Sequence, residues 1–381
     1  MLTKKQLSAF DFILVAMVVA MVACGITAIG SATRININGP EGEYRSQMLW
    51  FGTGLVLMLI MAFIDYHTLC KFFIPIYIFN IIILILVLLI GDGDEIGVRR
   101  WLFGLQPSEF SKIFMIIFLS KFIDKYQKKI NNISILIIVG LLTAIPFLLI
   151  KKQPSLSASL VLIAILGVEL FAGRLSYKYI LVVLLVAAAL GIVLYVDIKT
   201  ESHPLLKGVF KINDYQMSRL TDFINKDYSS STYYQTKHSI WAIGSGQLRG
   251  KGLYNGTVNQ LSYLPESHND FIFSVIGEEF GFIGCLSVIL LMYCIIVKCL
   301  VAAIKAADNL GRLIAAGVAG MFAFQTFVNI GVATGLLPNT GMTFPFLSYG
   351  GSSTWTNMLA VGLVLNVGMC KPKSMFEGRF I

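Results

Sequence analysis

The sequence predicts an all-α protein that crosses a membrane many times. Of its 381 residues, 56% are apolar and only 13% are charged, and the mean hydropathy is +0.76. This composition lies outside the range of soluble domains. The apolar residues also gather in runs of about 20, the length that a helix needs to cross the hydrocarbon core. We therefore expect a single transmembrane domain, residues 1–381, with ten membrane helices.

The expected spans lie near residues 9–31, 47–65, 71–90, 109–125, 133–150, 156–173, 179–197, 271–300, 312–334 and 346–370. The first is too long, and too closely followed by others, for a cleaved signal peptide. Lys and Arg concentrate in the connections that an inside N-terminus would leave in the cytoplasm, such as Lys128, Lys129 and Lys371. The positive-inside rule thus predicts that both termini are cytoplasmic.

Cysteine spacing and charge exclude several classes of protein. The six cysteines include no CxxC pair, so we expect neither structural disulfides nor a zinc site. Residues 92–103 lack the ligand spacing of an EF-hand, and we assign no metal ligands. The net charge of +9 has its cytoplasmic share spread over short connections, which favours contact with membrane lipids over nucleic-acid binding.

Residues 198–270 are predicted to form a large extracytoplasmic loop between helices 7 and 8. Two amphipathic pieces, 215–225 and 233–243, are expected to be helices along the membrane surface. The glycine-rich run 244–256, GSGQLRGKGLYNG, is not a Walker A motif, because Gly252 follows Lys251. Two interpretations stay open: its backbone N–H groups cradle a pyrophosphate, or the run is a flexible connector.

This loop ends in the run LPESHNDFIF, residues 264–273, which leads into the eighth span. Asp270 stands at the edge of the hydrocarbon, where an ionised carboxylate is costly, so it is either a functional acid or a helix cap. If Asp270 opens the helix, Gly277, Glu278 and Gly281 follow on one face. That face, with Glu278 about 12 Å deeper, is expected to meet a cavity or another helix.

The fourth span begins at QPSEFSK, residues 106–112, with a proline and an acid in its first turn. Glu109 and Lys112 share one face at i,i+3 spacing. Lys112 is either an anchor that extends to the membrane surface or a cavity residue that meets an anion.

Two later connections carry weaker signals. Ser155 or Ser157 is placed to cap the sixth helix, and Glu169, near that helix's other end, is expected to be solvated. Residues 335–353 are apolar yet broken by Pro and Gly. Such a stretch cannot be a helix exposed to lipid, so we expect a re-entrant segment before helix 10.

Several of these runs resemble the signature blocks of the SEDS family, which comprises RodA, FtsW and SpoVE, and among these the chain looks most like RodA. The runs are GVRRW at 97–101, QPSEFSK at 106–112, PESHNDFIF at 265–273, GEEFG at 277–281, LPNTG at 337–341 and FLSYGGSS at 346–353. They occur in the family's order, and the similarity spans nearly the whole chain.

The resemblance implies a peptidoglycan glycosyltransferase that polymerises lipid II into a growing glycan strand at the outer face of the bacterial cytoplasmic membrane. It also implies a class B penicillin-binding protein as partner. The family's essential aspartate corresponds to Asp270, its Glu and Lys in the fourth helix to Glu109 and Lys112, and a basic position to Lys251. The family's Gln-Pro-Asp-Leu-Gly-Thr block appears as QPSLSA, residues 153–158, so Ser155 replaces an aspartate. Glu109 is then left alone to balance Lys112.

Glycan polymerisation needs a base for the attacking sugar hydroxyl and cations for the departing lipid pyrophosphate. We expect Asp270 to be the base. The expected substrate-binding residues are Lys112, Glu109, Arg99, Arg100, Lys251, Glu278 and Ser348. A divalent cation, Mg²⁺ or Mn²⁺, could share the charge, although no dedicated metal cage is visible.

Two other functions stay open. A lipid II flippase would also have broken segments and buried charges, and Ser155 gives weight to a non-catalytic scaffold for the penicillin-binding protein. The candidate charges cluster at outer helix ends, which favours the enzyme.

Overall fold

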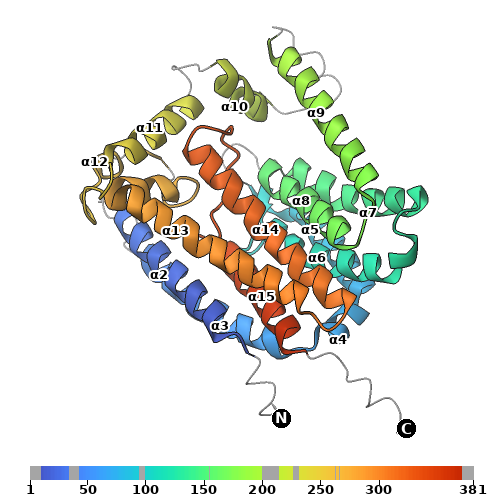
Figure 1. Cartoon of the computed structure of the whole chain (residues 1–381). Helices are drawn as coiled ribbons and strands as arrows, with labels where there is room; N and C mark the ends of the chain where they lie inside the picture. The colour runs from blue at the N-terminus through green and yellow to red at the C-terminus, as the bar shows by residue number, and fades with distance from the viewer. Residues whose placement is uncertain are drawn as a thin grey trace.

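The computed structural model shows a bundle of long helices (Figure 1). It describes residues 10–33, 43–93, 99–153, 155–199, 214–225, 231–261, 263–265 and 267–370. One helix falls on each expected span. These helices are α2 (Phe12–Thr33), α3 (Glu43–Phe63), α5 (Phe73–Ile90), α6 (Pro107–Lys125), α7 (Ile133–Lys152), α8 (Leu156–Ala172), α9 (Tyr177–Lys199), α13 (Ile272–Ile304), α14 (Asn309–Ala333) and α15 (Gly351–Met369).

Six of these helices, α2, α3, α5, α7, α13 and α14, are long and apolar enough to cross a membrane. On α3, α5 and α7, large apolar side chains such as Leu49, Phe79 and Leu141 are more than half exposed. Such outer surfaces suit lipid and would be unfavourable in water. The protein is therefore an all-α, multi-pass membrane protein, and the number of ten crossings stays a prediction.

Helix α14 runs through the middle of the bundle and packs against α6, α8, α13 and α15. Its small residues allow close contact: a Cβ at Gly317 would lie 2.5 Å from Oε1 of Glu169 on α8. The expectation that Glu169 is solvated is therefore wrong. Its side chain is fully buried between α6, α8 and α14, where the Ser120 hydroxyl donates a hydrogen bond to it at 3.2 Å.

Short elements connect the long helices. α4 (Tyr66–Lys71) lies between α3 and α5, and the 3₁₀ turn η1 (Gln127–Lys129) follows α6. β1 (Asp92–Gly93) pairs antiparallel with β2 (Arg99–Trp101). A tight turn then leads the chain from β2 into α6.

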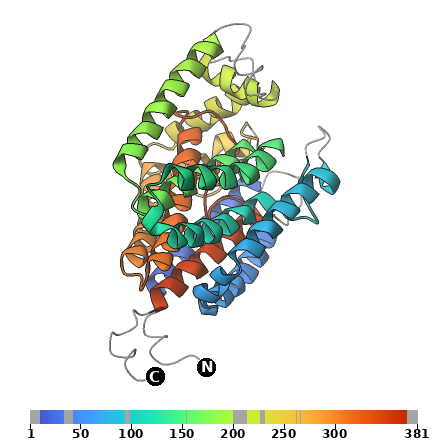
Figure 2. The same ribbon diagram turned by 90° about the vertical axis from the view of Figure 1, so that its right-hand side faces the viewer.

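The two amphipathic pieces of the large loop form α10 (Asp214–Asn225) and α11 (Ser231–Ser245), followed by the short α12 (Thr257–Gln260). Helix α10, with the end of α9, extends beyond the rest of the bundle (Figures 1 and 2). Residues 200–213 and 226–230 of the loop lie outside the described part of the chain.

The glycine-rich run is docked on α13, so it is not a flexible connector. Helix α13 is interrupted at Gly281, whose φ is 67°, and a Cβ there would lie 2.3 Å from the backbone nitrogen of Gly250. The N–H groups of Lys251 and Gly252 donate to the carbonyls of Glu278 and Glu279, at 3.0 and 2.9 Å. These donors are used inside the protein, and they fix the run in place.

Residues 335–350 form the expected re-entrant segment, an irregular stretch whose residues 344–348 are buried in protein, while Leu336 is exposed. The Asn329 side chain donates to the carbonyls of Asp270, at 3.0 Å, and Met342, at 2.7 Å. The Tyr349 N–H donates to His268 O at 3.0 Å. Helix α15 begins only at Gly351, so the expected start of the last span at 346 is too early.

Helix α2 begins and α15 ends at the same end of the bundle (Figure 1). Residues 1–9 and 371–381, to which the expectation of cytoplasmic termini applies, lie outside the described residues. At the opposite end of the bundle lie the starts of α6, α8, α13 and α15.

Candidate active site

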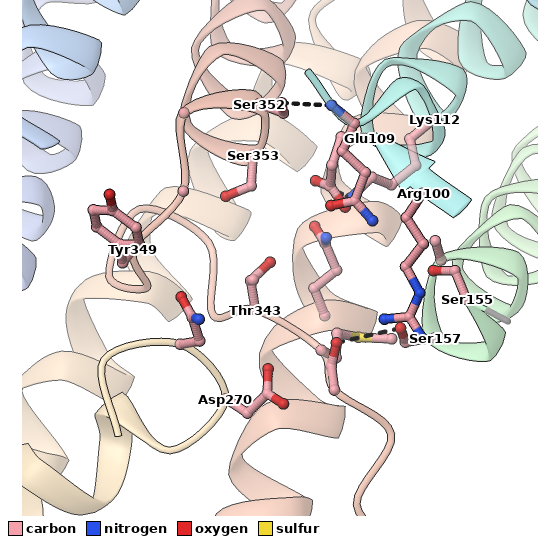
Figure 3. Close-up of a pocket in the computed structure, with 18 of the residues that line it drawn as sticks. Arg100, Glu109, Lys112, Ser155, Ser157, Asp270, Thr343, Tyr349, Ser352 and Ser353 are labelled. Atoms are coloured by element: carbon pink, nitrogen blue, oxygen red, sulfur yellow. Dashed lines mark hydrogen bonds and ion pairs between the residues drawn. The ribbon is translucent and has the colours of Figure 1, made fainter. Parts of the chain in front are cut away.

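A cavity of about 420 Å³ lies at the end where α6, α8, α13 and α15 begin (Figure 3). Its volume is within the usual range for small-molecule sites. The charged residues that line it are Arg100, Glu109, Lys112, Arg219 and Asp270. Because the residues come from separate parts of the chain, the cavity exists only in the folded protein.

Asp270 belongs to the turn before α13, and its carboxylate points into the cavity (Figure 3). The turn is fixed from behind: Ser348 Oγ donates to Asn269 O at 2.6 Å, and Asn329 donates to Asp270 O. Helix α13 starts at Ile272 with Phe271 as its N-cap residue. Asp270 therefore does not open the helix, and the N-cap position goes to its neighbour.

Lys112 and Glu109 form a buried ion pair on the first turns of α6. Lys112 Nζ lies 2.6 Å from Glu109 Oε2, and the Lys112 side chain is only 1% exposed. A lysine that anchors a helix at the membrane surface would extend toward water. Lys112 instead forms part of the cavity wall, the second of the two alternatives that its sequence position left open.

The two arginines of β2 point in different directions, as neighbouring residues of a strand do. Arg100 lines the cavity, and its Nε donates to Gln153 O at 3.2 Å. Arg99 is exposed and donates through Nη1 to the Leu89 carbonyl at 2.6 Å, away from the cavity lining. The structure thus brings one of the expected pair to Asp270's cavity.

Ser155, which stands where the family has an aspartate, also lines the cavity. It takes the N-cap position of α8 without a side-chain capping bond. The hydroxyl of its neighbour Ser157 donates to Gly341 O at 3.3 Å, joining α8 to the re-entrant segment. The cavity wall beside Lys112 therefore has one acid, Glu109. The Ser155 hydroxyl lies where the family has a second acid, an aspartate.

Like Arg99, three more expected site residues lie outside the cavity lining. Lys251 and Glu278 pair with each other at 2.7 Å, and Glu278 also accepts the N–H groups of Val258 and Asn259 at the start of α12. The buried Ser348 hydroxyl accepts the Phe344 N–H at 2.8 Å and holds the Asp270 turn. None of the three lines the cavity, and each has a visible role in holding the loop.

Sequence reasoning missed Arg219. It lies on α10 and lines the cavity, and its Nη1 donates to Asn339 O at 3.1 Å. A Cβ at Gly341 would lie 3.4 Å from Asp270 Oδ2 and 3.6 Å from Arg219 Nη1. The amphipathic pattern of α10 predicted a surface helix, but it gave no sign that one arginine reaches the re-entrant segment.

These features define a class: a multi-pass membrane protein with a charged cavity at one end of its helical bundle, large enough for part of a small-molecule substrate. A family model narrows the class. The FtsW/RodA/SpoVE model, described as "Cell cycle protein", matches residues 8–372. The chain belongs to this family, and the resemblance seen in the sequence is confirmed.

Similar proteins cover nearly the whole chain. "Probable peptidoglycan glycosyltransferase FtsW" of Trichlorobacter lovleyi is 35% identical over 381 residues, which cover 95% of this chain and 94% of the relative. A solved structure described as "Structural coordination of polymerization and crosslinking by a peptidoglycan synthase complex" matches with a TM-score of 0.77 and 28% identity, covering 94% of this chain and 97% of that one. RodA of Thermus thermophilus matches with a TM-score of 0.68 and 27% identity, covering 96% and 98%.

Proposed function

We propose that this chain, a peptidoglycan glycosyltransferase by family and fold, polymerises lipid II in the cavity that Asp270 lines. The observation that carries the proposal is the placement of one carboxylate, Asp270, in the same cavity as three cationic side chains, Arg100, Lys112 and Arg219. Sugar transfer from a lipid pyrophosphate needs this combination, a proton acceptor near charges that stabilise an anionic leaving group.

In the proposed reaction, a hydroxyl oxygen of the acceptor sugar forms a bond to the anomeric carbon of the donor. The bond from that carbon to the pyrophosphate oxygen breaks, and the lipid pyrophosphate leaves with the bonding electrons. Asp270 takes the hydroxyl proton. The turn held by Asn329 and Ser348 keeps this carboxylate in position, which favours a reactive geometry.

The three cationic side chains of the cavity differ in burial and in hydrogen-bonding geometry, so we assign them different roles. Lys112 is buried and already paired with Glu109, so it supplies a fixed, partly neutralised charge. Arg100 and Arg219 have planar guanidinium groups that can bind phosphate oxygens in pairs. We assign the pyrophosphate to these two arginines, with Lys112 behind them.

A divalent cation bound in the cavity would be an optional addition to the proposed mechanism. Asp270 and the hydroxyls of Ser155 and Ser157 are oxygen donors of the kind that Mg²⁺ or Mn²⁺ prefers. No step of the proposed reaction depends on such an ion.

The remaining expectations concern place and partner. We place the cavity at the outer face of the bacterial cytoplasmic membrane, with both termini in the cytoplasm. A class B penicillin-binding protein is proposed to cross-link the product, and the similarity to a synthase that coordinates polymerization and crosslinking supports this.

Two alternatives are separated by one experiment. A flippase needs polar side chains along a whole transmembrane path, whereas the charged residues of this cavity gather at one end of the bundle. A scaffold needs no proton acceptor at all.

Purified protein, with and without its partner, should be incubated with lipid II in detergent. Only a polymerase makes glycan strands in detergent, where there are no leaflets to cross. Failure to form strands with the partner present would exclude the proposed reaction.

A further inference from the structure

A second cluster of reactive side chains lies at the other end of the bundle, far from the cavity. Asp65 is the N-cap of α4, His67 lies in the first turn of α4, Asp308 is the N-cap of α14 and Cys370 is the C-cap of α15. Helix α15 starts at the cavity and has 19 residues, a length of about 28 Å. The cluster is thus separate from the site already described.

His67 stands between two carboxylates. Its Nδ1 lies 2.9 Å from Asp65 Oδ1, and its Nε2 lies 2.6 Å from Asp308 Oδ2. Ionised carboxylates only accept hydrogen bonds, and a neutral imidazole has a single N–H to donate. One of the two contacts therefore needs a further positive centre, which is either a second ring proton or a metal ion.

Both carboxylates are held in place by backbone groups. The His67 N–H donates to Asp65 Oδ1 at 3.0 Å, and the Gly311 N–H donates to Asp308 Oδ1 at 2.8 Å. The Tyr66 hydroxyl donates to the same Asp308 oxygen at 2.9 Å. These contacts order the acids before any ion arrives, which lowers the entropic cost of binding one.

Cys370 adds a sulfur donor to this arrangement. One ligand atom from each of Asp65, His67 and Cys370 lies within 4.8 Å of the others. Coordination to a cation would deprotonate this thiol and make it a thiolate ligand.

We propose that Asp65, His67 and Cys370 bind a divalent transition metal ion of the zinc class, with Asp308 as the outer partner of His67. Imidazole and thiolate donors select such ions over Mg²⁺ and Ca²⁺, which prefer oxygen. Histidine ligands commonly donate their second ring nitrogen to a carboxylate. Small movements of three side chains, two of them exposed, are enough to close the site.

The metal would tie α4 to the end of α15, beside the first turn of α14. The proposal departs from the expectation of no zinc site, which rested on the lack of a short cysteine motif; the donors here are spread from residue 65 to residue 370.

The test is a cobalt titration of the full-length protein, purified in detergent, freed of its affinity tag and stripped with a chelator. Co²⁺ should produce a thiolate-to-cobalt charge-transfer band at one equivalent, and Zn²⁺ should displace it. Cys370→Ser should abolish the band, whereas Cys294→Ser, which removes an exposed cysteine elsewhere, should leave it unchanged. His67→Gln should weaken binding about tenfold or more.

Thermal unfolding provides a second measurement that does not need the chromophore. Zn²⁺ should raise the unfolding temperature of the wild type and of Cys294→Ser; at the same Zn²⁺ concentration it should have no such effect on Cys370→Ser and a smaller one on His67→Gln. The proposal is overturned if the wild type gives no charge-transfer band, if Cys370→Ser keeps the band, or if Zn²⁺ stabilises all variants equally.

Discussion

The carboxylate of Asp270 and the guanidinium of Arg219 approach the same point above Gly341. A Cβ on that glycine would lie 3.4 Å from Asp270 Oδ2 and 3.6 Å from Arg219 Nη1. Asp270 reaches this point from the turn before α13, and Arg219 reaches it from α10. The large loop therefore contributes to the cavity, and the proposed base has a cation of the loop at its side.

Arg219→Ala is expected to slow glycan polymerisation about 10- to 100-fold, because a group that would stabilise the departing pyrophosphate is lost. The rate of Arg219→Lys should lie between those of the wild type and Arg219→Ala, since lysine keeps the positive charge but loses the paired guanidinium donors. Glycan length and yield from lipid II, measured with the partner present, give the result.

Arg249→Ala is the matched control for this experiment. Arg249 is exposed in the glycine-rich run, outside the cavity lining, so its loss should leave the rate nearly unchanged. Wild-type turnover in Arg219→Ala would remove this arginine from the proposed mechanism.

Asp270→Asn should reduce polymerisation by about 100-fold or more, the usual effect of losing a general base. The amide keeps the shape of the side chain, so the unfolding temperature should change little. Asp11→Asn is the control, since Asp11 pairs with Lys298 at 2.9 Å at the opposite end of the bundle. If both variants polymerise lipid II equally well, Asp270 is not the base.

Lys112→Met should destabilise the protein by about 3–5 kcal/mol, because it leaves Glu109 buried without its partner. In the double variant Lys112→Met/Glu109→Gln, unfolding should return toward the wild-type temperature while polymerisation stays low. An active double variant would show that the pair serves only the fold. Unfolding in detergent and initial rates should be measured on the same preparations.

The spans could be predicted from the sequence because an apolar run of about 20 residues is a local property. The error at the last span has a physical cause. Residues 346–350 are mostly apolar, yet they belong to a buried irregular segment, and α15 starts at Gly351. Hydropathy reports burial in an apolar environment, and it does not distinguish lipid from protein.

The site was only partly predictable. Glu109 and Lys112 pair as their i,i+3 spacing suggests, since that contact lies within one helix. The face of α13 that carries Glu278 is turned inward as expected. Its partner Lys251 comes from the glycine-rich run, and no periodic pattern indicates where such a run docks. Arg219 was missed for the same reason.

Glu278→Gln should therefore lower stability without changing the chemistry. The Glu278 side chain is fully buried and accepts hydrogen bonds from Lys251, Thr257, Val258 and Asn259. Loss of its charge leaves Lys251 without a counter-ion and weakens the start of α12. The unfolding temperature should fall, while the rate per folded molecule stays within about twofold. A large loss of rate in fully folded protein would place Glu278 in the mechanism after all.

The last prediction concerns pH and the large loop. His238 on α11 lies among the rings of Tyr234, Trp241 and Tyr263, with centroids 4.1, 5.1 and 5.5 Å away. Burial, followed by the positive charge of Lys237, lowers the pKa of His238. The folded state then binds a proton less readily than the unfolded chain, whose histidine pKa is about 6.5.

The stability contributed by neutral His238 is complete above about pH 6.5 and is lost as the pH falls through the lower folded pKa. As the pH is lowered from about 7.5 to 5.5, we expect the unfolding temperature of the wild type to drop more than that of His238→Phe. Phenylalanine keeps an aromatic ring at this position and cannot be protonated. Tyr234→Phe serves as the control for a change in the ring cluster that leaves the histidine in place. Parallel curves for the wild type and His238→Phe would contradict the assignment, because other titrating groups would then account for the whole pH dependence.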